Sequence, residues 1–247
     1  MQRITPFEIG KYYHVYNRGI ERRKIYLEPL DYSRFMLLLY LCNTTENIQL
    51  NQLFRDIKRK KEKTKSKITE SDVLKLYELP KKDLLVSICA YSLMPNHFHL
   101  ILQEIREGGI STFMQKLLTA YSMYFNIKNK RSGSLFMKPF RSKYIKNEHY
   151  FMYLLGYLHL NQVKLIDPKW KENGITDLSK IKDFLSKYKY SSIHDYLAGF
   201  KNSRPEFAII DTKSIPDYFS SSHEFEDFLD SWLTYSSEYA DEDFFDK

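Results

Sequence analysis

Residues 84–103 read LLVSICAYSLMPNHFHLILQ, and this stretch decides the fold. Residues 84–91 and 97–103 are two runs of apolar and β-branched side chains, separated by Met-Pro-Asn, a combination that forms turns. We therefore expect two strands that pair antiparallel. The remaining elements of a small sheet can be sought on either side of this pair.

The flanking segments extend the two strands into an α+β fold. YYHVYN at residues 12–17 predicts an earlier strand, and residues 135–145, interrupted at a proline, predict a later one. Apolar residues at helical spacing predict helices that Asp31 and Ser111 can cap, and Asn147 can cap a third helix through about residue 162. This order fits a ferredoxin-like split βαβ, with a four-stranded antiparallel sheet, two helices on one face and the last helix on the other.

The chain of 247 residues is long enough for one domain with a sizeable core and appendages. We expect a catalytic domain over residues 1–200, interrupted at residues 53–82 by a basic insertion. Within the insertion, RDIKRKKEKTKSK carries eight basic and two acidic side chains, so it should be exposed and either mobile or partly helical. Residues 201–247 form a C-terminal extension, in which one amphipathic helix is predicted from Phe225, Phe228, Leu229 and Trp232.

The net charge of +7 is unevenly spread, because residues 224–247 carry −8 and leave +15 for the first 223 residues. A body that basic attracts a polyanion such as nucleic acid, although solvated lysines explain the charge equally well. The acidic end either folds back over the basic surface or stays solvated. With two cysteines, no signal peptide and no apolar run long enough to span a bilayer, the sequence predicts a soluble cytoplasmic protein without a membrane partner.

The second strand of the pair carries a candidate metal site. Side chains alternate between the faces of a strand, so His97 and His99 should project together while Phe98 points to the opposite layer. Two imidazoles on one face make a pair of metal ligands. Two half-buried structural histidines are the alternative interpretation.

A helix from residue 148 would carry a candidate nucleophile. Tyr153, Tyr157 and Asn161 recur every four residues, so they share one face of that helix. A phenol can attack a phosphodiester, and two imidazoles with an amide oxygen suit Mg²⁺ or Mn²⁺ better than a closed zinc site. Tyrosines on an amphipathic helix are also often core residues.

YSLMPNHFHLILQ at residues 91–103 resembles the histidine-hydrophobic-histidine (HUH) signature of the single-tyrosine transposases of insertion sequences, in particular the REP-associated tyrosine transposases. Further stretches resemble the same branch in the same order: YHVYNRG (13–19), DYSRF (31–35), YFNIKNKRSGSLFMKPFRSKYI (124–145), YLLGYLHLNQVK (153–164) and YKYSSIHDYL (188–197). The resemblance covers most of residues 12–197. It implies an enzyme that cuts and rejoins single-stranded DNA, commonly beside a hairpin, through a 5′-phosphotyrosine.

The resemblance also implies roles for individual residues. It places the nucleophile at Tyr157, which we expect to face solvent, the metal-binding histidines at His97 and His99, and the third ligand at Asn161. The family often has Asn-Pro after the tyrosine where this chain has Asn-Gln, so Gln162 is an alternative amide ligand. Both monomeric and homodimeric relatives are implied, which leaves the oligomeric state open.

Cations near the first and last predicted strands can bind DNA phosphates, and aromatic side chains can stack on unpaired bases. An ordinary surface cation or core aromatic is the alternative at every such position, and Tyr121 also belongs to the apolar stripe of its predicted helix. Among the histidines, His159 faces away from Tyr157 and His14 shows no pattern. The candidate DNA-binding residues are Arg18, Lys138, Arg141, Lys143 and Tyr121, with Tyr124 as a second aromatic and Lys164 as a cation near the nucleophile.

Two other functions are compatible with these residues. A DNA- or RNA-binding regulator would keep the fold without cutting. A metal-dependent hydrolase of small phosphoesters would use the two histidines but neither Tyr157 nor a basic body. Covalent trapping on single-stranded hairpin DNA separates the three functions, because only a tyrosine transposase forms an adduct that survives denaturation.

Overall fold

The computed structural model describes residues 6–46, 50–63, 65, 69–175, 177–201, 204–219 and 221–234. The strands are β1 (Tyr12–Arg18), β2 (Val86–Met94), β3 (His97–Glu104) and β4 (Arg141–Tyr144). The α-helices are α1 (Pro29–Leu41), α2 (Leu50–Lys63), α3 (Glu70–Leu74), α4 (Gly109–Lys128), α5 (Glu148–Leu160), α6 (Trp170–Asn173), α7 (Leu178–Lys187), α8 (Ile193–Leu197) and α9 (Ser222–Thr234). Short 3-10 helices are η1 (Ile20–Arg22), η2 (Lys75–Glu78), η3 (Asn161–Leu165), η4 (Pro205–Ile209) and η5 (Thr212–Ser214).

The four strands form one antiparallel sheet in the order β2-β3-β1-β4. Pro95 and Asn96 form the turn between β2 and β3, as their sequence predicts. β2 carries an irregularity between Ile88 and Ala90, which shifts its register against β3 by one residue. The chain order β1-α1-β2-β3-α4-β4-α5 is the predicted one, with α2 and α3 added between α1 and β2. The α+β fold class with a split βαβ sheet is confirmed.

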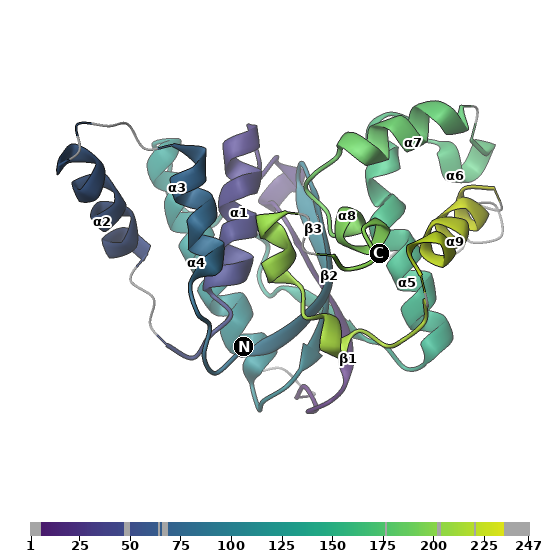
Figure 1. The fold of residues 1–247 in the computed structure, drawn as a ribbon, viewed down its shortest axis with the longest axis horizontal. Helices are drawn as coiled ribbons and strands as arrows, with labels where there is room; N and C mark the ends of the chain where they lie inside the picture. The colour runs from purple at the N-terminus through teal and green to yellow at the C-terminus, as the bar shows by residue number, and fades with distance from the viewer. Residues whose placement is uncertain are drawn as a thin grey trace.

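One face of the sheet is covered by α1 and α4, which lie side by side (Figure 1). We call it the α1/α4 face. Its strands contribute Val15, Phe98, Leu100 and Leu102, which are fully buried against the apolar sides of both helices. Each such side chain contributes about 1.5–3 kcal/mol to folding through its burial, so this face holds the sheet together.

Both helices on this face begin three residues earlier than the sequence predicts, with their N-caps at Glu28 and Gly108. Asp31 lies in the first turn of α1, where its carboxylate accepts hydrogen bonds from the backbone N–H groups of Leu27 and Glu28. α4 begins before Ser111 because the buried carboxylate of Glu104 accepts its first two backbone N–H groups, at 3.0 and 2.7 Å. A carboxylate at a helix N-terminus also interacts favourably with the helix dipole.

The opposite face of the sheet carries His14, His97 and His99, and we call it the histidine face. It is covered by α5 and by α6, α7, α8 and α9 (Figure 1). Asn147 caps α5 as predicted, since its side-chain oxygen accepts the N–H of Tyr150 at 2.9 Å. The α-helix ends at Leu160, and η3 continues the chain as a tighter helix.

The basic insertion is partly helical, as predicted, and forms α2, α3 and η2. In the first half of α2, Leu53, Phe54 and Ile57 pack against the core of the α1/α4 face. The guanidinium of Arg34 on α1 lies 4.1 Å from the centre of the Phe54 ring. An apolar anchor therefore precedes the charged part of this segment.

Residues 204–219 and 221–234 of the extension pack on both faces of the sheet. η4 contacts α1, η5 contacts β2, and Arg204 forms an ion pair with Asp195 of α8. α9 is the predicted amphipathic helix, and Trp232 packs on α5 so closely that a Cβ atom at Gly156 would lie 2.5 Å from its ring. The remainder of the acidic tail, residues 235–247, lies outside the described residues.

The described part of the chain contains no helix with the length and hydrophobicity needed to cross a bilayer.

Candidate active site

The alternation of β3 places His97 and His99 on one face, as predicted. Their ring centres are 5.1 Å apart and their planes lie at 88°. His99 is fully buried and His97 is partly exposed at the end of the strand. On the neighbouring strand β1, Tyr16 lies opposite His99 and Arg18 lies opposite His97. These two side chains therefore share the histidine face.

Hydrogen bonds fix the orientation of both rings. His97 Nδ1 lies 2.7 Å from the side-chain oxygen of Asn96, which can only accept, so the proton is on Nδ1 and the lone pair is on Nε2. His99 Nδ1 lies 2.8 Å from Nε2 of His14 on β1. No sequence pattern singled out His14, because its contact with His99 depends on which residues of β1 and β3 face each other.

The buried imidazoles are neutral at neutral pH. Burial, with Lys164 and Arg18 adding positive charge, lowers the pKa of His97 to about 4. Burial also lowers the pKa of His14 to about 3, and burial beside two other histidines holds the pKa of His99 well below its ordinary value. A neutral imidazole is the form that binds a metal ion.

α5 carries Tyr157 over the histidine face. Its ring centre lies 5.5 Å from that of His99, with the planes at 85°. Asn161 follows one turn later at the start of η3, and its Nδ2 donates to His97 Nε2 at 3.3 Å. Rotation of this carboxamide by half a turn would place its oxygen, instead of its nitrogen, next to His97 Nε2. Tyr153 packs elsewhere, with its ring centre 5.2 Å from that of Trp232 on α9, so Tyr157 is the tyrosine of α5 beside the histidines.

The amide of Gln162 bonds to β2, at Ser92, which lies opposite His99. Its Oε1 accepts a hydrogen bond from the hydroxyl of Ser92 on β2 at 3.0 Å, and the side chain is fully buried. Of the two amides that the sequence offers, the structure therefore places Asn161 beside the histidine pair. The Nε2 atom of His159 lies 2.8 Å from the hydroxyl oxygen of Ser192.

A family model described as "Transposase IS200 like" matches residues 40–164, which is half of the chain. The chain belongs to the IS200-like transposase family. The matched span includes His97, His99, Tyr157 and Asn161, and membership implies an enzyme that cleaves DNA. The family expected from the sequence motifs is confirmed.

Among solved structures, this transposase is similar to a REP-associated tyrosine transposase bound to a REP hairpin. The TM-score is 0.43 and the sequence identity is 15%, over 89% of this chain and 99% of the other. None of the curated protein sequences compared with the transposase matches it.

Tyr157 does not face solvent as expected, because only 3% of its surface is exposed. The ammonium group of Lys171 on α6 lies 4.5 Å from the centre of its ring. Lys171 comes from the segment after Pro168, where the sequence pattern is weak, so nothing in the sequence indicated this contact. The transposase thus encloses the expected nucleophile beneath a cation.

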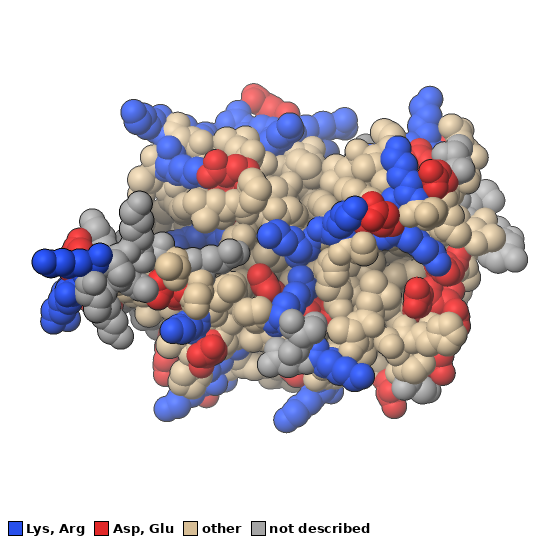
Figure 2. Space-filling view, turned by 45° about the horizontal axis from the view of Figure 1, so that its top comes forward, with Lys and Arg blue, Asp and Glu red and all other residues tan. Residues whose placement is uncertain are grey.

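Charged side chains are unevenly distributed over the surface of the transposase. Figure 2 shows lysines and arginines spread over one face and projecting at the end formed by α2, whereas acidic side chains gather at the opposite end, where α9 lies. Asp230 of α9 pairs with Lys182 of α7 at 2.6 Å. This part of the acidic segment therefore lies on the helical cover of the histidine face.

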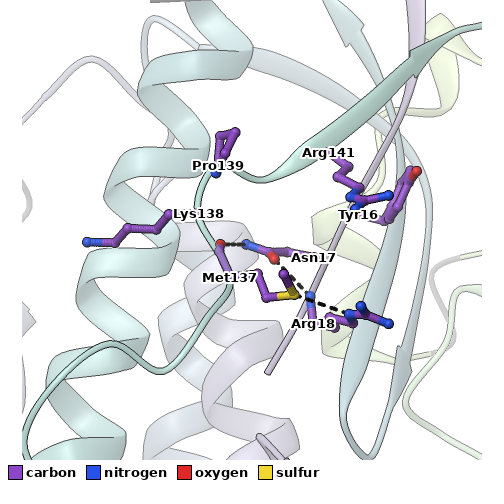
Figure 3. A pocket seen from close by; sticks show the side chains of 7 residues that line it. All are labelled: Tyr16, Asn17, Arg18, Met137, Lys138, Pro139 and Arg141. Carbon is purple, nitrogen blue, oxygen red and sulfur yellow. Dashed lines mark hydrogen bonds between the residues drawn. The ribbon is translucent and has the colours of Figure 1, made fainter. Parts of the chain in front are cut away.

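Three of the candidate DNA-binding cations, Arg18, Lys138 and Arg141, line one hollow of about 130 Å³ (Figure 3). Lys143, two residues further along β4, lies outside it, with its ammonium 4.9 Å from the ring centre of Tyr150. The structure thus gathers three of these cations and leaves one apart.

The prediction that Tyr121 stacks on DNA bases is wrong. Its ring is fully buried in the core of the α1/α4 face, and its hydroxyl donates to the backbone oxygen of Ile25 at 2.6 Å. An enclosed ring has no surface to offer a base. Tyr124 is half-buried, and its hydroxyl donates to Asp31 at 2.9 Å.

Proposed function

We propose that this transposase cuts and rejoins single-stranded DNA at hairpin-flanked sites with Tyr157 as the nucleophile. The observation that carries the proposal is the position of the Tyr157 ring, 5.5 Å from His99, with Asn161 at His97. A phenol and a set of ion-binding groups on one face meet the two needs of phosphodiester cleavage, a nucleophile and compensation of phosphate charge. The charge of +15 on the first 223 residues favours a polyanionic substrate.

The proposed reaction is a reversible transesterification. The Tyr157 oxygen attacks phosphorus and loses its proton to solvent, while the bond from phosphorus to the 3′-oxygen breaks. The products are a 5′-phosphotyrosine and a 3′-hydroxyl, whose oxygen takes up a proton. Attack by a 3′-hydroxyl reverses the step and rejoins the strand. The ammonium of Lys171 beside the ring favours the negative charge that develops on the phenol.

His97, His99 and Asn161 are the residues that would hold a divalent ion, Mg²⁺ or Mn²⁺. The donor set fits, because the lone pair of His97 Nε2 faces Asn161 and a proton on His99 Nδ1 would leave a lone pair on its Nε2. When bound, the ion supplies positive charge to the non-bridging phosphate oxygens. Nδ1 of His97 bonds to Asn96, and Nδ1 of His99 bonds to His14. Hydrogen bonds of this kind commonly orient the rings of metal-binding histidines.

Within the described residues, no group of three histidine, cysteine or acidic side chains has the arrangement of a metal site. We propose the amide of Asn161, which lies at His97, as the third protein ligand of an ion at the histidine pair. Mg²⁺ and Mn²⁺ accept such oxygen ligands.

The proposed catalytic unit spans residues 1–200, with the extension as part of its cover. Tyr157 and both histidines come from one chain, which supports a monomer as the smallest active unit. Because Tyr157 is enclosed, bound DNA must displace part of this cover, and Lys171 of α6 is the side chain that lies over the ring.

Covalent trapping tests the nucleophile. The transposase is incubated with Mn²⁺ and hairpin oligonucleotides labelled at the 3′ end, and adducts that survive denaturation are counted. Tyr157→Phe should abolish the adduct, because the variant lacks only the attacking oxygen. Tyr153→Phe, one turn away on α5, is the matched control and should keep it. The reverse result would place the nucleophile one turn earlier.

The same experiment separates the rival functions. A mobility shift without any adduct would favour a non-cleaving DNA- or RNA-binding regulator. Hydrolysis of small phosphoesters that survives Tyr157→Phe, without any shift, would favour a metal-dependent phosphoesterase.

A further inference from the structure

The hollow beside the histidines arises from a break in the pairing of β1 with β4. The two strands pair up to Tyr16 and Arg141, and an unbroken register would then bring residue 139 opposite Arg18. Instead the backbone N–H of Met137 donates to the oxygen of Arg18 at 3.0 Å. The chain at residues 138–140 thus holds two extra residues and arches away from β1, which leaves space between them (Figure 3).

Hydrogen bonds hold this space open. The side chain of Asn17 donates to the backbone oxygen of Met137 at 3.0 Å, and its own oxygen accepts the N–H of Arg18 at 2.8 Å. The guanidinium Nε of Arg18 lies 3.2 Å from the sulfur of Met137. The resulting volume is about 130 Å³. A cavity of roughly 150 Å³ accommodates a benzene ring, so the hollow has room for a planar ring rather than for one water molecule.

The lining selects for the chemistry of a nucleotide. It offers two guanidinium groups, one ammonium, a phenol ring and a thioether, without an acidic side chain. Guanidinium groups bind phosphate in a fork geometry, and aromatic rings provide stacking surfaces for bases. In Figure 3 the side chain of Arg141 lies beside the Tyr16 ring, with Arg18 below them, while the side chain of Lys138 extends away from these residues. An anion with a planar ring satisfies both parts of this lining.

The hollow adjoins the proposed cleavage site. Tyr16 and Arg18 line it, and they are also the residues of β1 that lie opposite His99 and His97. Opposite residues of an antiparallel pair have Cβ atoms only about 4.5–5.5 Å apart. A single strand whose phosphate lies at the histidines therefore passes its neighbouring nucleotide over the hollow.

We propose that the hollow between β1 and the arch at residues 138–140 receives one unpaired nucleotide next to the cleaved phosphate. Its base lies against Tyr16 and Met137, and its phosphate contacts Arg18 and Arg141. The inference rests on the proposed function, because the histidine pair marks where the cleaved phosphate lies.

An abasic scan tests the hollow. Binding is measured with the Tyr157→Phe protein, so that no strand is cut during the measurement. The probe is a hairpin oligonucleotide with a single-stranded flank, chosen by adduct formation with the wild type or, if none forms, by tightest binding. Each flanking nucleotide in turn loses its base but keeps its phosphate. Removing the base at one position should weaken binding about tenfold, because one stacked base is lost. Removing the base at any other position should change the affinity little.

Variants assign that position to the hollow. Arg141→Gln should weaken binding and remove the difference between the sensitive abasic position and the others. Lys143→Gln makes the same change of charge two residues along β4, outside the hollow, and should preserve the difference. Met137→Trp fills the space without changing charge and should reproduce the effect of the missing base. Thermal unfolding of each variant identifies any loss of fold.

The possible failures are distinguishable. An adduct together with a flat abasic scan overturns the nucleotide site and leaves the tyrosine chemistry intact. A sensitive position that persists in both Arg141→Gln and Met137→Trp also overturns it. Another outcome of the scan is one sensitive position that disappears in Arg141→Gln and Met137→Trp while the wild type forms no adduct. That result supports the site and contradicts the tyrosine chemistry. Failure to bind any oligonucleotide overturns both proposals.

Discussion

The α1/α4 face and the histidine face belong to the same sheet and each has an apolar core, but they differ in the side chains that the middle of the sheet contributes. The first encloses apolar groups such as Phe98 and Leu100. The second encloses His14, His99 and Gln162, each with a hydrogen-bonding partner. Burying a polar group costs free energy that its hydrogen bonds largely offset, so such groups add little net stability. We therefore expect the apolar middle of the α1/α4 face to contribute more to stability, and the middle of the histidine face to hold the groups of the proposed chemistry in position.

The largest effects are expected from substitutions at adjacent residues of β3, which point to the two different faces of the sheet. Phe98→Ala should lower the free energy of unfolding by about 3–5 kcal/mol, because a fully buried ring is lost. Added Mn²⁺ should still raise the melting temperature of that variant. The double variant His97→Ala, His99→Ala should lose both cleavage and protection by Mn²⁺, since only an ion bound to the native state raises stability.

Thermal unfolding with and without Mn²⁺ measures both effects. Equal protection of the double variant and the wild type would place the ion elsewhere and remove the chemical distinction between the two faces.

A smaller effect is expected where the extension covers α5. Gly156→Ala puts a Cβ atom 2.5 Å from the ring of Trp232, and overpacking of this kind costs about 1–3 kcal/mol. Hydrogen exchange should accelerate in α5 and α9 but not in α1 and α4, because only the histidine face depends on this contact. Adding Trp232→Leu should relieve the clash. Uniform acceleration in all four helices would show that the two faces unfold as one unit.

The smallest effect concerns pH. Burial lowers the pKa of His14 to about 3 and that of His159 to about 3, against an ordinary value of about 6.5. As pH falls, the unfolded chain therefore binds protons before the folded chain does, and stability is lost below about pH 6.5. The loss should be about 1 kcal/mol per histidine between about pH 7 and about pH 5.5.

Denaturant unfolding of the metal-free protein at the two pH values measures this slope. His14→Phe should make it shallower, while His223→Gln, at an exposed position, is the control. An unchanged slope in His14→Phe would mean that the histidine face is protonated without loss of folding.

Local patterns predicted what depends on local geometry. Alternation in β3 and the four-residue spacing on α5 placed His97, His99, Tyr157 and Asn161 on the correct sides of their elements. The same logic already assigned Tyr121 to an apolar stripe, and its burial shows that the stripe was the better guide than its aromatic ring. Whether Tyr157, Asn161 and the histidines perform the proposed chemistry stays a prediction.

Contacts between distant segments could not be predicted in this way. His14 meets His99 through cross-strand register, which the spacing within one strand does not define. Lys171 reaches α5 from a segment of weak periodicity. The pattern that predicted α9 gave it an apolar side but did not show that Trp232 on this side would pack on α5. The enclosure of Tyr157 was missed for that reason, because its cover is built from residues far along the chain.

The contact of Trp232 with Gly156 also has a consequence for the timing of synthesis. A ribosome adds about 5–20 residues per second, so α5 emerges several seconds before α9 can pack on it. During that interval β1, α1, β2, β3 and α4 are already available to fold, whereas the helix that carries Tyr157 still lacks part of its cover. A nascent chain that stalls before residue 222 would thus have the sheet and its histidines, but a tyrosine helix that is not yet held in place.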